Sequence, residues 1–275
     1  MFAYAPMYGI QIAFRDFKAN LGFLKSPWVG LKYFQQFVAL SNFWQLIQNT
    51  LLISVYSILF GFPAPILLAL MLNQLRFARF QKFVQTISYA PYFISTVVLV
   101  SMLNIFLAPS TGFVNNIIVS FGGKAVTFTG RAEWFRTVYV ASGVWQGIGW
   151  GAIVYLASLS GVNPELYEAA MVDGATRFQR VWHIDIPGIL PTVVIMFILQ
   201  MGSLMNVGYE KAYLMQNALN NQVSEIISTY VYKIGLLNAK FSFSTAVGLF
   251  NSLINFILVV STNMISQRLT QTSLW

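Results

Sequence analysis

The chain has 275 residues, of which 57% are hydrophobic and only 9% are charged. Soluble domains carry about 25% charged residues, so the composition excludes a water-exposed globular surface and indicates an integral membrane protein. The absence of cysteine excludes disulfides and cysteine metal sites, and the single histidine, His183, excludes a multi-histidine metal site. The basic residues behind the net charge of +8 lie between long apolar stretches, which favours lipid headgroups over nucleic acid as their partner.

Five apolar stretches reach the roughly 20 residues that a membrane-spanning helix needs. They cover residues 46–72, 86–107, 138–159, 189–207 and 244–265, and none of their cores contains a charged residue or histidine. Residues 1–14 are also apolar but too short to span, and they lack the basic start and cleavage site of a signal peptide. We expect them to form the last turns of a further helix. The sequence therefore predicts an all-α membrane protein, a single transmembrane domain over residues 1–275 with six spans, of which the first is truncated.

Proline and glycine interrupt several of these stretches. They are Gly61, Pro63 and Pro65 in the first stretch, Pro91 in the second, and Gly143, Gly147, Gly149 and Gly151 in the third. Interrupted helices at membrane depth need neighbours or a water-filled cavity to satisfy the freed backbone groups. Two interpretations follow, namely close helix packing through small residues and a cavity wall or hinge.

The short loop 73–82 carries Arg76, Arg79 and Lys82 and no acid, which favours a cytoplasmic location. Other loops also carry lysine and arginine, so charge alone does not fix the orientation.

Residues 161–187 lie between the third and fourth stretches and predict a short helix, a break and a second short helix. Asn163 is a good N-cap, Pro164 fits the first helical position and Glu165 favours the helix dipole. Gly174 marks the end of the first helix, and Pro187 is expected to begin the next span. By physics alone, this segment fits either a docking helix or an interfacial helix lying on lipid.

The same segment contains a spaced pattern of residue types. It reads Glu168-Ala169-Ala170, Gly174, Ile184 and Ile186-Pro187. This pattern resembles the EAA loop of the permease subunits of binding-protein-dependent ABC importers, with Ile186 in place of the usual leucine, a volume-conserving change.

Further matches resemble the sugar-importer branch of that family and its polysaccharide-type subfamily. They are Asp173-Gly174-Ala175, Asn49-Thr50, Ala90-Pro91, Gly143-Val-Trp145, Gly208-Tyr-Glu-Lys-Ala-Tyr213 and Asn217. The resemblance implies the six-helix type I importer permease fold, half of a translocation pathway, and an oligosaccharide or polysaccharide cargo, with alginate as one candidate.

The resemblance also implies roles for the segment. In this family the EAA loop is cytoplasmic and inserts into a cleft of the ATPase subunit. Glu168 would pair with a basic group there, Ala169 and Ala170 would permit close approach, and Gly174 would turn the chain. Asp173 and Arg177 would make further contacts.

The implied partners are a second homologous permease, an ATPase dimer, a periplasmic or extracellular solute-binding protein and membrane lipid. The chain contains no Gly-rich phosphate-binding motif, so ATP and Mg²⁺ are expected on the partner ATPase and no cofactor on this chain. The expected location is the bacterial inner membrane, crossed several times.

Sugars are bound by aromatic faces and neutral hydrogen-bonding groups, which makes the polar and aromatic residues of the spans candidates for the pathway. They are Trp145, Gln146, Trp150, Tyr155, Gln200, Asn206, Tyr209, Glu210, Asn251, Ser252 and Asn255. The alternative for each is interhelical hydrogen bonding, worth about 0.6 kcal/mol per bond on average. Lys211 and Lys233 are candidates for attracting an anionic sugar, with ordinary surface lysines as the alternative. His183 fits a structural or interface contact better than a pH switch.

Two other function classes compete with this interpretation. An ion-coupled secondary transporter would show internal repeats and often an intramembrane acid, and neither is evident in the sequence. A membrane enzyme or scaffold would act without an ATPase or a binding protein. Nothing in the sequence resembles a nucleophile paired with a base.

Overall fold

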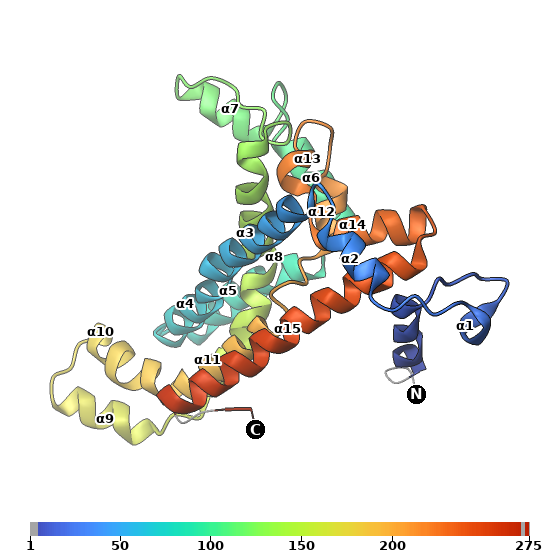
Figure 1. Ribbon diagram of the computed structural model, residues 1–275. Helices are drawn as coiled ribbons and strands as arrows, with labels where there is room; N and C mark the ends of the chain where they lie inside the picture. The colour runs from blue at the N-terminus through green and yellow to red at the C-terminus, as the bar shows by residue number, and fades with distance from the viewer. Residues whose placement is uncertain (1–4, 271–272, 275) are drawn as a thin grey trace. The chain divides into compact units, whose positions relative to one another are not determined.

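The computed structural model describes residues 5–270 and 273–274 (Figure 1). These residues are helical apart from turns, loops and one isolated antiparallel bridge between Arg15 and Trp28. They form two compact units. Three long helices have residues in both units: α3 (Phe43–Gly61), α8 (Ala132–Ser160) and α15 (Phe241–Thr270).

The first unit comprises residues 5–54, 96–137 and 203–257. Besides parts of the long helices, it contains the 3-10 helix η1 (Ala5–Phe14), α1 (Gly22–Lys25), α2 (Lys32–Val38), α6 (Thr96–Phe106), α7 (Phe113–Ser120), α12 (Tyr209–Met215), α13 (Asn221–Ser224), α14 (Ile227–Tyr232) and the π-helix η4 (Lys233–Leu237). Its core includes an aromatic cluster in which the ring of Phe37 lies 5.0 Å from that of Phe43 and 5.3 Å from that of Phe250. This cluster joins α2 to α3 and α15.

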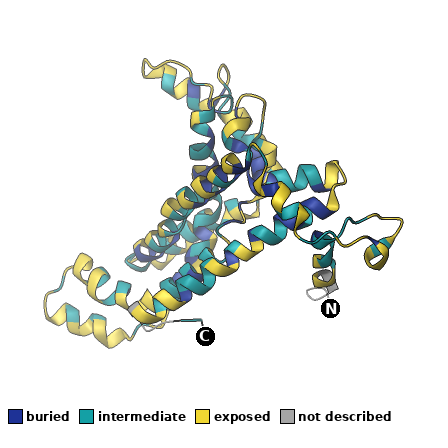
Figure 2. Ribbon diagram, viewed as in Figure 1, coloured by how far each residue is buried: buried dark blue, intermediate teal, exposed yellow. Residues whose placement is uncertain are grey.

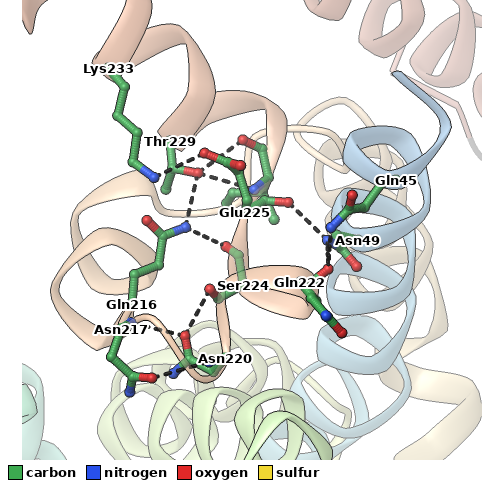
Figure 3. Close-up of polar contacts among 11 residues, drawn as sticks. Gln45, Asn49, Gln216, Asn217, Asn220, Gln222, Ser224, Glu225, Thr229 and Lys233 are labelled. Atoms are coloured by element: carbon green, nitrogen blue, oxygen red, sulfur yellow. Dashed lines mark hydrogen bonds and ion pairs between the residues drawn. The ribbon is translucent and has the colours of Figure 1, made fainter. Parts of the chain in front are cut away.

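A polar network also ties α3 to the chain around α13 (Figure 3). Asn49 is buried; its Nδ2 donates to the carbonyl oxygens of Gln222 and Glu225 at 2.8 and 3.0 Å. Its Oδ1 accepts a hydrogen bond from Nη2 of Arg136 at 3.0 Å. The neighbouring Thr50 accepts from the backbone N–H of Ile227 at 3.0 Å. The Asn-Thr pair therefore fixes the loop that leads into α14.

The second unit comprises residues 55–95, 138–202, 258–270 and 273–274. Besides parts of the long helices, it contains α4 (Pro63–Asn73), α5 (Ala78–Tyr89), the 3-10 helix η2 (Ala90–Phe93), α9 (Pro164–Val172), α10 (Arg177–Arg180), the π-helix η3 (Val181–Asp185) and α11 (Ile186–Met201). Its core is a buried cluster from α4, α8 and α11 that includes Ala69, Tyr155 and Ile189.

Among the described residues, four helices are long and apolar enough to span a membrane, and a broken pair makes a fifth. The four are Phe43–Asn73, Ala132–Ser160, Arg177–Met201 and Phe241–Arg268, and the broken pair is Ala78–Phe93 with Thr96–Phe106. At most 28% of the most apolar window of any of the four is buried within the chain. The rest of these windows is half-buried or exposed, and both classes run along the long helices in Figure 2. The apolar side chains among them must be covered by lipid or another subunit.

Two boundaries differ from the sequence prediction. The stretch 86–107 is not one continuous helix, because a 3-10 turn containing Pro91 ends at Phe93 and Ile94 is extended. The fourth span ends at Met201 rather than at residue 207. Residues 202–208 form turns and loop instead, and the side chains of Asn251 and Asn255 satisfy the backbone groups of Met205.

The predicted additional helix near the start is a 3-10 helix over Ala5–Phe14, and residues 1–4 of that prediction lie outside the described residues. Its assignment as the end of a further span stays a prediction.

Candidate functional site

Residues 161–187, called the docking segment from here on, form the two short helices that the sequence predicts. The Asn163 side chain accepts a hydrogen bond from the backbone N–H of Glu165 at 3.0 Å, and Pro164 begins α9. Gly174 has φ +73°, a left-handed conformation that favours glycine and ends the helix. Thr176 and Gln179 cap α10 reciprocally, a feature not anticipated from the sequence.

The predicted coupling residues form an accessible surface on this segment (Figure 2). Glu168, Ala169, Asp173, Gly174 and Arg177 are exposed, and Ala170 is half-buried. The same surface exposes large apolar side chains. They are Leu166, Met171, Val172, Phe178 and Trp182, with Val172 88% exposed. Charged and apolar side chains together on two short helices fit a protein partner or a lipid surface.

The junction with the next span differs from the prediction. Pro187 does not begin a separate helix, since α10, η3 and α11 follow one another without a break from Arg177 to Met201. A proline inside an α-helix clashes with the carbonyl four residues earlier. The π-turn η3 (Val181–Asp185) widens the helix directly before Pro187, which accommodates the ring.

Asp185, at the end of this π-turn, is a functional candidate that the sequence analysis missed. Its side chain is 0% exposed. It accepts hydrogen bonds from the hydroxyl of Tyr167, from Nε2 of Gln74 at 2.8 Å and from Nδ2 of Asn73 at 3.3 Å. The pattern Ile-Asp-Ile-Pro carries no signal of this role, because two of the donors lie more than 100 residues away.

The glycines of α8 divide between the two interpretations offered above. A Cβ on Gly149 would clash with the carbonyl oxygen of Ser88 and lie 2.8 Å from the backbone nitrogen of Tyr89. A Cβ on Gly151 would lie 2.9 Å from Cγ of Pro65. These two glycines therefore permit close packing.

Gly143 and Gly147 line a cavity of about 410 Å³ in the same unit, and Gly151 lines it as well. Tyr155 and Gln200, two of the predicted pathway residues, line the same cavity. Tyr155 is only 3% exposed and is also part of the hydrophobic core.

The other predicted pathway residues of α8 lie beside the broken span. Nε2 of Gln146 donates to the carbonyl oxygen of Ile94 at 2.8 Å, which satisfies a backbone group freed by the break. The ring of Trp150 stacks on that of Tyr92 with centroids 4.5 Å apart and an interplanar angle of 5°. Trp145 is 46% exposed. Gln146 and Trp150 therefore both have partners on the broken span, whereas Trp145 is exposed.

Four predicted pathway residues line a cavity of about 650 Å³ in the first unit. They are Asn206, Tyr209, Asn251 and Ser252. The sequence analysis missed Tyr232, whose ring stacks on that of Tyr209 with centroids 5.3 Å apart. The cavity thus combines aromatic faces with neutral hydrogen-bonding groups.

Two asparagines of α15 hold the loop beside this cavity. Oδ1 of Asn255 accepts from the backbone N–H of Met205 at 2.9 Å. Nδ2 of Asn251 donates to Oδ1 of Asn206 at 2.9 Å. Asn255 is buried and outside the cavity lining, and its contact joins α15 to the loop that follows Met201. Its pathway role stays a prediction. Glu210 is exposed in the first turn of α12.

Neither candidate lysine is an ordinary surface lysine. Lys211 is 9% exposed, and burial lowers its pKa from 10.5 to about 8. Lys233 forms an ion pair with Glu225 at 2.9 Å. Nδ1 of His183 donates to the carbonyl oxygen of Gln179 at 2.9 Å, one turn earlier, which is a local structural contact.

Comparison with known proteins identifies the family. A profile of the family described as binding-protein-dependent transport system inner membrane component matches residues 61–271. Protein LplB of Bacillus subtilis (strain 168) is 44% identical over 275 residues, which are 100% of this chain and 86% of that protein. The polygalacturonan/rhamnogalacturonan transport system permease protein YteP of the same organism is 44% identical over 268 residues, 98% of this chain and 84% of that protein.

Solved structures confirm the predicted all-α importer permease fold. A chain in the crystal structure of a bacterial ABC transporter involved in the import of the acidic polysaccharide alginate is 40% identical, with a TM-score of 0.91 over 98% of this chain and 91% of that chain. A second structure is that of a bacterial alginate ABC transporter in complex with alginate pentasaccharide-bound periplasmic protein. Its matching chain is 39% identical, with a TM-score of 0.91 over 100% of this chain and 91% of that chain. The chain therefore belongs to the family of inner membrane components of binding-protein-dependent transport systems, as a multi-pass ABC permease subunit and not an enzyme.

Proposed function

We propose that this chain forms half of the pathway through which an ATP-driven importer carries an oligosaccharide or polysaccharide across the bacterial cytoplasmic membrane. Alginate is the first candidate cargo. The observation that carries the proposal is that a relative and two structural neighbours are all named for polysaccharide transport. The relative YteP is named for polygalacturonan and rhamnogalacturonan, and the structural neighbours are named for alginate import.

The cavity beside Tyr209 and Tyr232, lined by both apolar and polar side chains, supports a carbohydrate cargo. Stacked tyrosine rings offer apolar faces, and the surrounding amides and hydroxyls offer neutral donors and acceptors. Its volume of about 650 Å³ lies in the range of small-ligand sites, enough for a few sugar units. A polymer would pass such a site one short segment at a time.

The docking segment is the proposed contact with the ATPase, which places it and loop 73–82 in the cytoplasm. Glu168 and its neighbour Ala169 are both exposed. Because the alanine side chain is small, a partner protein can approach the Glu168 carboxylate closely. The proposed assembly contains a second homologous permease, two ATPase subunits that bind ATP and Mg²⁺, and an extracytoplasmic solute-binding protein.

The test of the pathway uses the assembled transporter in liposomes, with uptake of alginate oligosaccharides driven by ATP and a loaded binding protein. Tyr232→Ala is expected to lower uptake about tenfold, because it removes one of the two stacked rings at the cavity. Tyr8→Ala removes an exposed tyrosine outside the cavity and serves as the control. Equal uptake by the two variants would contradict a pathway role for this cavity.

Glu168→Arg tests the docking surface. We expect it to separate ATP hydrolysis from uptake while the subunit still folds, because the side chain is exposed. Glu133→Arg reverses an exposed charge outside the segment and is the matched control. Unchanged transport in Glu168→Arg would contradict the proposed contact.

The ion-coupled alternative finds no support in the comparisons. It predicts uptake that persists without ATP and follows a proton or sodium gradient. The same liposomes, prepared with a gradient and without nucleotide, measure this directly.

A further inference from the structure

A buried carboxylate joins three parts of the second unit. Asp185 belongs to η3, which leads directly into α11. Tyr167, one of its donors, belongs to α9. The other two, Asn73 and Gln74, are the last residue of α4 and the residue that caps it. One side chain thus holds the docking segment to the ends of two apolar helices.

We propose that Asp185 is a positioning residue that tethers α9 to α4 and α11, so that a displacement of the docking segment moves both helices together. This inference rests on the proposed function for its consequence in transport. Its structural content, that Asp185 holds α9 in place, does not depend on which partner the segment contacts.

The environment of α9 explains why one hydrogen bond matters here. The helix buries none of its residues, and only Tyr167 and Ala170 within Pro164–Val172 are not exposed. Hydrophobic burial therefore contributes little to its attachment. A nine-residue helix is also marginal by itself, so contacts with the rest of the protein decide its position.

The chemistry of the contact is that of a carboxylate accepting from neutral donors. Burial and the neighbouring Asp185 raise the pKa of Tyr167 to about 12, so its hydroxyl keeps its proton at neutral pH and donates it. Hydrogen bonds to a carboxylate are stronger than those between neutral groups. Removal of the acceptor would take the shared partner from three donors, of which only Tyr167 and Asn73 also contact each other.

Three variants separate the arms of this tether. Tyr167→Phe removes the hydrogen bond to Asp185 and the contact between Tyr167 and Asn73, and leaves the hydrogen bonds from Asn73 and Gln74 to Asp185 in place. Asp185→Ala removes all three hydrogen bonds. Asp185→Asn keeps an oxygen that accepts from Tyr167, and rotation of the Gln74 amide presents its oxygen to the new NH₂ group. Asp185→Asn is therefore the conservative variant expected to restore positioning.

The first measurement is hydrogen exchange of the α9 backbone amides in the assembled transporter without nucleotide. In Tyr167→Phe we expect about tenfold faster exchange in α9, equivalent to about 1.4 kcal/mol of lost local stability. The effect at the end of α4 should be smaller, because Asn73 loses Tyr167 but keeps Asp185. Asp185→Ala should speed exchange at both places, and Asp185→Asn should restore wild-type rates in α9. Tyr8→Phe, at an exposed tyrosine, controls for loss of a hydroxyl.

Wild-type exchange in α9 of Tyr167→Phe would overturn the proposal, as would equally fast exchange in Asp185→Asn and Asp185→Ala. If Asp185→Ala does not assemble, the Tyr167→Phe and Asp185→Asn measurements still decide.

The second measurement is the number of sugar molecules imported per ATP hydrolysed, with alginate oligosaccharides as the probe. A loosened segment should let ATP hydrolysis continue while this ratio falls at least threefold in Tyr167→Phe, whereas mere loss of folded protein lowers both rates and leaves the ratio unchanged. An unchanged ratio would overturn the role in transport.

The tether and the docking function can fail separately. Faster exchange in Tyr167→Phe together with normal transport in Glu168→Arg would support the tether and contradict the ATPase contact. Normal exchange in Tyr167→Phe, together with ATP hydrolysis uncoupled from uptake in Glu168→Arg, would contradict the tether and support the ATPase contact.

Discussion

Replacement of Gly149 by alanine tests the close packing of α8 against the end of α5. The new Cβ would clash with the carbonyl oxygen of Ser88 and lie 2.8 Å from the backbone nitrogen of Tyr89. Ordinary carbon contacts begin at about 3.5 Å, so the two helices must separate by at least about 0.7 Å. The atoms struck belong to the backbone, and no side-chain rotation relieves the clash.

The net effect follows from two opposed terms. Overpacking costs about 1–3 kcal/mol, and a backbone clash belongs at the upper end of that range. Alanine recovers about 1 kcal/mol of helix propensity over glycine. We therefore expect a net destabilisation of about 2 kcal/mol, which corresponds to a fall of about 4–8 °C in the midpoint of thermal unfolding.

Gly147→Ala provides the matched control on the same helix. No atom lies within 4 Å of a Cβ at that position, so only the propensity gain applies and the midpoint should stay or rise. The assay is thermal unfolding of the purified protein in detergent for both variants. Equal midpoints for the two variants would refute the packing argument.

Three other substitutions are expected to change stability, each measured by thermal unfolding of the purified protein. Asn49→Ala should cost about 2–3 kcal/mol, because it removes hydrogen bonds to two loop carbonyls and to a guanidinium group; a loss below about 0.5 kcal/mol would contradict this. Gln146→Leu should cost about 1 kcal/mol, because the carbonyl at the break in the second span loses its donor; unchanged stability would indicate that another donor replaces it. The pKa of Lys211 is about 8 in the folded protein and 10.5 ordinarily, so between these pH values the unfolded state binds more protons than the folded state. The free energy of unfolding, relative to that of Lys211→Met, should therefore rise by about 3 kcal/mol from pH 8 to 10.5. The same pH dependence of stability in both proteins would contradict this.

The apolar helices and the docking segment were predictable because their signals are local. Length and hydropathy located the long helices, and Asn163 and Gly174 set the ends of α9 through capping and a left-handed turn. The family resemblance of the same segment was confirmed by the comparisons. What this segment contacts stays a prediction.

The missed features all depend on residues far apart in the sequence. The residues next to Asp185 in the sequence are apolar and give no sign of a hydrogen-bonded site. Only the fold brings its hydrogen-bond donors to it. The burial of Lys211 and the stacking of Tyr232 on Tyr209 likewise arise from tertiary packing. The predicted end of the fourth span was wrong for a related reason. Buried asparagines on α15 form hydrogen bonds with backbone groups of the loop that follows Met201.

The unbroken helix from Arg177 to Met201 has a mechanical consequence. Its 25 residues, at a rise of about 1.5 Å each, make a rod about 37 Å long. A tilt of about 10° at the exposed end would sweep the far end through about 6 Å, comparable to the width of a sugar ring. Pro187 follows the π-turn η3 and Pro191 lies inside α11, yet the helix continues past both. An angular displacement at its first turn would therefore become a linear displacement at its last.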